Sequence, residues 1–151
     1  MMAVDSNIWI YYIDPTRPEH EQVSRFMDDT ILSGEEILTN TAVWMEVGHY
    51  LYKTSRLPRE AILDIVEGLM TLPTMIVAEL DVGLLYRSLA ILARLQAYPI
   101  GGRDATILAA MEKFGTRRLA THDSGFKRLA EDGLIEVIDP VTGEEVPPGR
   151  T

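Results

Sequence analysis

The stretch that decides the fold is MAVDSNIWIYYI, residues 2–13. An apolar strand is predicted over residues 2–4, followed by an acid, Asp5, and an apolar helix over residues 7–13. The segment RRLATHDS, residues 117–124, has the same order, with Asp123 after a strand predicted over residues 117–121. Open α/β sheets bind ligands in the crevice outside the carboxyl ends of their strands. Both acids are therefore expected at a ligand-binding edge.

Predicted strands and helices alternate along the rest of the chain. Pro18 begins one helix and Gly34 ends it, while Asp81 can cap a long helix whose apolar stripe runs to Leu95. Strands are also predicted over residues 36–39, 74–79 and 134–138, and helices over residues 41–55, 58–72, 103–114 and 124–131. This alternation predicts an α/β fold, a three-layer α/β/α sandwich around a short, mainly parallel sheet. Residues 1–139 are expected to form a single domain and residues 140–151 a C-terminal tail.

The composition narrows the class of protein. A chain of 151 residues, 46% of them hydrophobic, suits one domain with a sizeable core. The complete lack of Cys excludes disulfides, thiolate metal sites and cysteine nucleophiles, and it suits a reducing compartment. The first residues show neither a basic nor a long apolar leader, and charged residues interrupt the longest apolar run. We therefore expect a cytoplasmic protein without a membrane segment.

The charge is unevenly distributed. A net charge of -9 argues against unspecific coating of nucleic acid, because like charges repel at long range. Residues 99–130 reverse the balance, with six basic residues against three acidic ones. This stretch contains Asp104 and Asp123. It is either a set of ordinary solvated helix faces or a patch that steers phosphate, and the sequence favours neither.

Two further acids border predicted helix faces that are apolar. Asp104 precedes Ile107 and Leu108 by one helical turn, so it shares their inward face near the helix start. Glu46 lies three residues after Val43, at the border of the buried stripe of its helix. Helix phase and strand ends can thus bring four carboxylates to one mouth: Asp5, Glu46, Asp104 and Asp123. Gathered there, they predict a metal-dependent enzyme that acts on phosphate.

Each of these acids also has a simpler explanation. Asp5 and Asp123 can cap the helices that follow them, and Asp104 can complement its helix dipole. A salt bridge to a nearby Arg would satisfy Glu46. The polar neighbours are equally open to two interpretations: Asn7 caps its own helix or orients Asp5, and Thr121 is an ordinary strand residue or a supporting one.

The joint pattern resembles a known family. Its fragments are VDSN at residues 4–7, VWME at residues 43–46, RDATILAA at residues 103–110 and LATHD at residues 119–123, with Phe126 after them. In this order they resemble the PIN-domain nucleases, and among these most closely the VapC-type toxins of bacterial and archaeal toxin–antitoxin pairs. The resemblance covers residues 2–139.

The resemblance implies a function and a site. It implies hydrolysis of RNA phosphodiester bonds by a homodimer that an antitoxin holds inactive, with Mg²⁺ or Mn²⁺ held by the four carboxylates. Asp5 and Asp104 would bind the main ion, Glu46 would join its shell, and Asp123 would serve a second ion or orient the first. The supporting residues would be Asn7 and Thr121, and the candidates for substrate contact are Arg103, His122 and Lys127.

Three other functions compete with this one. The Glu-x-x-His spacing of Glu46 and His49 fits di-iron bundles, but such sites need the motif twice. A receiver domain would need its acceptor Asp near the end of the middle strand, where Glu79 stands. A non-catalytic PIN-like module would act through protein partners, for which exposed aromatics would serve. The candidate aromatics are Trp9, Tyr11, Tyr12 and Trp44.

Overall fold

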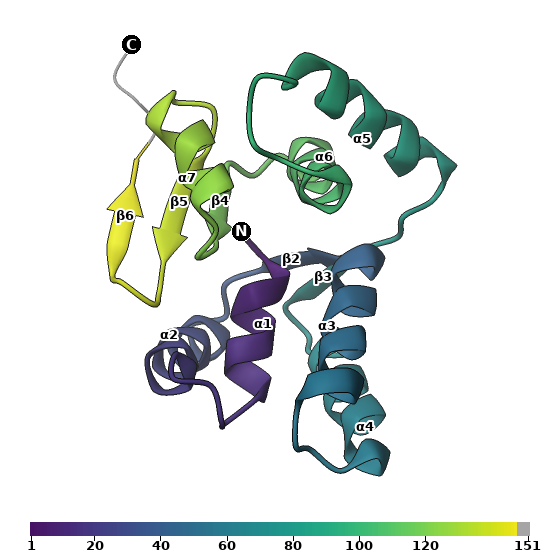
Figure 1. Cartoon of the computed structure of the whole chain (residues 1–151), viewed down its shortest axis with the longest axis vertical. Coiled ribbons are helices and arrows are strands. Elements are labelled where there is room, and N and C mark those ends of the chain that lie inside the picture. Colours follow the sequence, from purple (N-terminus) through teal and green to yellow (C-terminus); the bar gives the residue numbers. More distant parts are fainter. Residues whose placement is uncertain (148–151) are drawn as a thin grey trace.

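The computed structural model describes residues 1–147 and consists of strands that alternate with single helices or helix pairs (Figure 1). The strands are β1 (Met2–Val4), β2 (Ile37–Asn40), β3 (Met75–Ala78), β4 (Arg118–Ala120), β5 (Glu136–Asp139) and β6 (Glu144–Val146). The helices are α1 (Ser6–Ile13), α2 (His20–Leu32), α3 (Thr41–Thr54), α4 (Arg59–Met70), α5 (Val82–Arg94), α6 (Gly102–Phe114) and α7 (Ser124–Glu131). Most predicted bounds differ from these by one or two residues.

One sheet carries the fold, with the strand order β3-β2-β1-β4-β5-β6. The first five strands are parallel, and Ala3 of β1 pairs with Leu38 of β2 on one side and with Leu119 of β4 on the other. The connections between the strands place α1–α4 on one face of the sheet and α5–α7 on the other, as Figure 1 shows. The predicted three-layer α/β/α architecture is confirmed.

The chain reverses its direction across the sheet between β1 and β4. The strands β1, β2 and β3 follow one another outward, and the chain then returns through α5 and α6 to the other side of β1. Such a switch point opens a crevice at the carboxyl ends of the two central strands. Because β3 lies at the sheet edge, Glu79 does not follow a middle strand, and this removes the receiver-domain alternative.

Two tryptophans pack against each other in the helical layer that carries Glu46. The rings of Trp9 on α1 and Trp44 on α3 lie 4.9 Å apart between centroids, and only 0% and 5% of their surfaces are exposed. Tilted ring pairs of this kind add to the stability gained by burial. Both tryptophans therefore belong to the core and give no support to a partner-binding role.

The segment predicted as a tail contains a strand. Residues Glu144–Val146 form β6, which pairs antiparallel with β5. A turn with Gly143 at a φ of 76° reverses the chain, and Lys127 Nζ lies 2.9 Å from a carboxylate oxygen of Glu144. The parallel sheet thus gains an antiparallel edge. Residues 148–151 of the predicted tail lie outside the described residues. Within residues 1–147, no helix is both long and apolar enough to cross a membrane.

Candidate active site

The first acid stands at the switch point between β1 and β4. Asp5 is 3% exposed and caps α1: its Oδ1 accepts a hydrogen bond from the Ser6 backbone N–H at 2.7 Å. Its Oδ2 accepts a second bond from the Thr121 hydroxyl, also at 2.7 Å. Both carboxylate oxygens are therefore held by groups from the two central strand ends.

The second acid is tied to the same hydroxyl. Asp123 caps α7 by accepting a bond from the Gly125 N–H at 2.8 Å, and its own backbone N–H donates to Thr121 Oγ1 at 3.0 Å. Thr121 is fully buried and joins Asp5 to Asp123 through one oxygen. The capping roles predicted for both acids are confirmed, and they hold the acids at one crevice.

The third acid comes from α6, which lies on the same face of the sheet as α7 (Figure 1). Asp104 lies in the first turn of α6 and accepts a hydrogen bond from the Gly101 N–H at 2.9 Å. The loop before α6 packs against the start of α7, because a Cβ built on Gly125 would lie 2.6 Å from the Pro99 carbonyl oxygen. Only glycine permits this approach of two backbones. The approach seats the start of α7, and with it Asp123, against the loop that leads to Asp104.

The fourth acid forms an ion pair. The carboxylate of Glu46 on α3 contacts the guanidinium Nε of Arg103 on α6, so the salt bridge predicted as its simpler explanation is confirmed. Asn40 holds these two helices in register. Its Oδ1 accepts from the Val43 N–H at 2.9 Å, and its Nδ2 donates to Thr106 Oγ1 at 3.3 Å.

The pKa values show that the carboxylates act on one another. Burial raises the pKa of Asp5 to about 6; hydrogen bonds from Thr121 and Ser6 oppose the rise, and the charges of Asp104 and Asp123 add to it. Burial also raises the pKa of Asp104, with further increases from Asp123 and Glu46. Hydrogen bonding from Gly101 and the charge of Arg103 lower it. The site is thus a cluster of like charges that favours protons or cations.

The donor chemistry of the cluster fits a hard divalent cation. Every candidate ligand is a carboxylate or amide oxygen, which Mg²⁺ and Mn²⁺ prefer. Asn7 Oδ1, two residues beyond Asp5, is buried without a hydrogen-bond partner among the described residues. No three His, Asp or Glu side chains within residues 1–147 meet as a ready-made ion-binding group. The carboxylates are coupled through their charges but stand apart.

The candidates for substrate contact have different surroundings. The guanidinium of Arg103 forms an ion pair with the carboxylate of Glu46. Lys127 Nζ lies 2.7 Å from Asp139 and 2.9 Å from Glu144. The strand β4 ends at Ala120, so His122 lies beyond the strand. Its Nδ1 lies 2.7 Å from Asp139 Oδ2.

Three polar residues of this region were missed by sequence reasoning. Ser6 is buried beside Asp5, Asn40 bridges α3 and α6, and Asp139 is buried beneath His122 and Lys127. Asn40 carried a usable signal, since Asn directly before a helix is a preferred cap. Ser6 and Asp139 carried none, because their roles depend on the burial of neighbouring elements.

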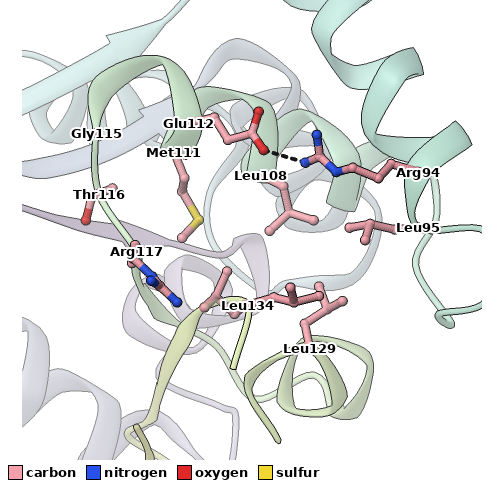
Figure 2. Close-up of a pocket in the computed structure, with 11 residues that line it drawn as sticks. Arg94, Leu95, Leu108, Met111, Glu112, Gly115, Thr116, Arg117, Leu129 and Leu134 are labelled. Carbon is pink, nitrogen blue, oxygen red and sulfur yellow. Dashed lines mark hydrogen bonds and ion pairs between the residues drawn. The ribbon is translucent and has the colours of Figure 1, made fainter. Parts of the chain in front are cut away.

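A separate cavity of about 350 Å³ lies toward the opposite end of α6 (Figure 2). Its lining is mainly apolar, with Leu108 and Met111 among the lining residues, and Arg94 contacts Glu112 at 2.5 Å across its rim. Glu112 is two helical turns beyond Asp104, about 12 Å along the axis. The cavity contains none of the four carboxylates and is not part of the candidate site.

Comparisons with known proteins agree with the geometry. The model of the PIN domain family matches residues 2–132. A curated protein from Mycobacterium tuberculosis, ribonuclease VapC13, is 30% identical over 141 residues, which covers 86% of this chain and 100% of that protein.

Solved structures share the fold at lower identity. VapC20 of Mycobacterium tuberculosis, described as a toxin that cleaves the sarcin-ricin loop, superposes with a TM-score of 0.71 at 18% identity over 85% of this chain and 94% of that one. A toxin–antitoxin complex from Klebsiella pneumoniae gives a TM-score of 0.59 at 22% identity over 93% of this chain and 98% of that one.

Proposed function

Because this chain belongs to the PIN-domain family, and within it to the VapC-type proteins, we propose that it is an endoribonuclease that hydrolyses RNA phosphodiester bonds with a divalent cation. The observation that carries the proposal is that one buried hydroxyl, that of Thr121, joins Asp5 to Asp123 at the switch point, with the charge of Asp104 also acting on Asp5. Like charges gathered around a buried carboxylate are costly for the fold, and such clusters concentrate at functional sites.

The four carboxylates would hold the cation, Mg²⁺ or Mn²⁺. Asp5 and Asp104, whose pKa values are raised by burial, are the main ligands in this proposal, and Asn7 Oδ1, two residues beyond Asp5, is an acceptor without a partner among the described residues. The Oε2 atom of Glu46 contacts Arg103, so this oxygen can join only after the ion pair opens. When bound, such an ion neutralises charge that develops on the phosphate and lowers the pKa of a water molecule.

The polar neighbours of the carboxylates fix their orientation. The Thr121 hydroxyl donates to Asp5 and accepts from the Asp123 backbone, so one side chain sets two ligands. Its hydrogen bond also lowers the pKa of Asp5 and thereby favours the ionised form that binds a cation. Residues that orient ligands in this way affect activity nearly as strongly as the ligands themselves.

A Thr121→Val variant tests this orientation. We expect cleavage to fall about 10- to 100-fold, because Asp5 loses its donor and the Asp123 N–H its acceptor. The acid limb of the pH–rate profile should move to higher pH, since the pKa of Asp5 rises further without the hydroxyl. Steady-state rates between pH 5 and 8 measure both effects. Thr121→Ser keeps the hydroxyl and should behave like wild type; equal losses in both variants would point to packing instead.

The requirement for a cation tests the function itself. Purified protein is incubated with tRNA, rRNA and mRNA in Mg²⁺, in Mn²⁺ and in excess chelator. We expect cleavage with either ion and a fall of at least 10²-fold in chelator, because the cation supplies several kcal/mol of transition-state stabilisation. Readmission of the ion should restore the rate. Undiminished cleavage in chelator would contradict a cation-dependent site.

We further propose a protein antitoxin as the partner, a homodimer as the assembly and the cytoplasm as the location. Two apolar grooves support a protein partner: one of about 510 Å³ between α3 and α4 and one of about 830 Å³ between α3 and α5. Met45, 75% exposed, lines both grooves. The second groove also contains Glu46 and Arg103, so a segment bound there would reach the site. The lack of Cys suits the reducing cytoplasm.

A further inference from the structure

An aromatic pair lies beside the carboxylates on the β5 side of the crevice. The rings of Tyr11 and His122 meet edge to face, with 6.3 Å between their centroids. His122 stands between Thr121 and Asp123 in the sequence, and Tyr11 lies on α1, about 9 Å along the helix axis from Asp5. The pair is therefore at the same edge of the sheet as the candidate site.

The imidazole of His122 is held by the buried carboxylate of Asp139. Its Nδ1 lies 2.7 Å from Oδ2 of Asp139, whose carboxylate is fully buried and also receives Lys127 Nζ at 2.7 Å and the Val141 N–H at 2.9 Å. An ionised carboxylate only accepts hydrogen bonds, so Nδ1 carries the hydrogen and Nε2 points away from Asp139. The His122 side chain is 36% exposed. The fold thus presents one edge of a positioned ring to solvent.

A guanidinium lies over the tyrosine. The Arg17 Cζ atom is 5.3 Å from the centroid of the Tyr11 ring, a cation–π distance. One of its nitrogens lies 3.3 Å from a carboxylate oxygen of Glu19, and its Nε is buried without a hydrogen-bond partner among the described residues. The corner that carries Arg17 is rigid, since Asp14 accepts from the Thr16 N–H at 3.0 Å and from the Thr16 hydroxyl at 2.7 Å.

Arg17, Lys127 and Arg103 each contact a carboxylate, and the contact of Arg17 with Glu19, at 3.3 Å, is the longest of these. Lys127 is shared between Asp139 and Glu144, and Arg103 is paired with Glu46. The side chains of Arg17 and His122, 35% and 36% exposed, place hydrogen-bonding nitrogens beside the Tyr11 ring. Proteins bind single-stranded nucleic acid with this combination of aromatic faces and cationic groups along the backbone.

We propose that Tyr11, Arg17 and His122 form a nucleotide-binding subsite that holds the sugar–phosphate backbone of single-stranded RNA next to the bond that is cut. This inference rests on the proposed ribonuclease function. In it Arg17 contacts a phosphate, the Tyr11–His122 pair supports the nucleotide, and Asp139 and Lys127 are positioning residues that fix His122. The subsite supplies binding, and the carboxylates supply the reaction.

The test separates binding from the reaction. Arg17→Ala and His122→Ala are assayed in Mg²⁺ with a short single-stranded RNA that wild type cleaves. We expect KM to rise about 5- to 100-fold, on the scale of one lost stacking or phosphate contact, while kcat stays within about twofold. Arg17→Ala should also reduce the salt dependence of binding, with the slope of log Kd against log salt smaller by about 0.7. Arg25→Ala, an exposed arginine on α2, is the matched control and should keep both constants.

The outcomes distinguish this inference from the function on which it rests. If wild type cleaves no RNA with any cation, the ribonuclease proposal fails. If wild type cleaves and both variants keep KM within twofold, the subsite is wrong and the carboxylate site stands. A fall in kcat without a change in KM also overturns it. Titration of the same RNA into variants that also carry Asp104→Asn measures binding without cleavage. Tyr11→Leu removes the aromatic ring, and Tyr11→Phe, which retains the ring, is used if Tyr11→Leu fails to fold.

Discussion

Asp104→Asn is expected to lower the rate of RNA cleavage by about 10²–10³-fold while leaving the fold intact. The substitution removes one negative charge from the cluster and weakens the hold on the cation. It preserves the local structure, because an amide oxygen can still accept the hydrogen bond from the Gly101 N–H. Single-turnover cleavage of RNA in saturating Mg²⁺ measures the effect, and circular dichroism checks the fold.

A second aspartate provides the matched control. Asp81 caps α5 by accepting a hydrogen bond from the Leu84 N–H at 2.8 Å, and it is not among the four carboxylates. Asp81→Asn makes the same chemical change at a helix start and should leave cleavage within about twofold of wild type. Should Asp104→Asn cleave as fast as Asp81→Asn, the observed nuclease activity would belong to a contaminant or to another site.

Asp5→Asn is expected to stabilise the cation-free protein by up to about 3 kcal/mol at pH 7.5. The pKa of Asp5 rises on folding from 3.8 to about 6, a difference that corresponds to roughly 3 kcal/mol. At pH 7.5 the Asp5 carboxylate is ionised in the folded state, although its buried surroundings favour the protonated form. The amide carries no charge, so the variant avoids the penalty, and a gain of this size raises the melting temperature by roughly 6–12 °C.

The pH dependence fixes the sign of this effect. Below pH 3.8 the Asp5 carboxyl is protonated in both folded and unfolded chains and costs nothing. As the pH rises from 3.8 through about 6, the unfolded chain releases its proton first, so wild type loses stability; above that range the full loss persists. The difference in melting temperature between variant and wild type should therefore shrink as the pH is lowered from 7.5 to 4. A difference that is constant over this range would contradict the assignment.

Cation binding should cancel most of this difference in stability. Mn²⁺ binds the folded state of wild type and raises its melting temperature, by an amount equivalent to about 2.7 kcal/mol at a hundredfold excess over Kd. Asp5→Asn lacks a main ligand and should shift little. Thermal melts with and without Mn²⁺ at pH 7.5 compare the two proteins. Equal shifts in both would show that the ion binds elsewhere.

The sequence predicted the fold well because its decisive signals are local. An apolar strand followed by an acid and a helix can be recognised within a dozen residues, and β1, α1 and α7 formed as expected. The edge strand β6 was missed because it contains two glutamates and lies among prolines. It forms through pairing with β5 and contact with Lys127, which depend on distant residues.

The candidate site was predictable in its parts but not in its connections. Strand ends and helix phase indicated Asp5, Asp104 and Asp123, and the structure couples their charges. The bond from Thr121 to Asp5 joins residues more than a hundred positions apart, and no local pattern encodes it. The same holds for the hydrogen bond between His122 and Asp139. These two residues meet because the ends of β4 and β5 are neighbours in the sheet.

The short strand β6 has a consequence for turnover of the protein. The hairpin between β5 and β6 runs through exposed residues, and Glu144 beyond it holds Lys127, which in turn contacts Asp139. A protease that cuts at Thr142 or Gly143 would release β6, leave the edge of β5 open and loosen the support beneath His122. A single cut near the end of the chain would thus change the surroundings of His122 beside the crevice while leaving the four carboxylates in place.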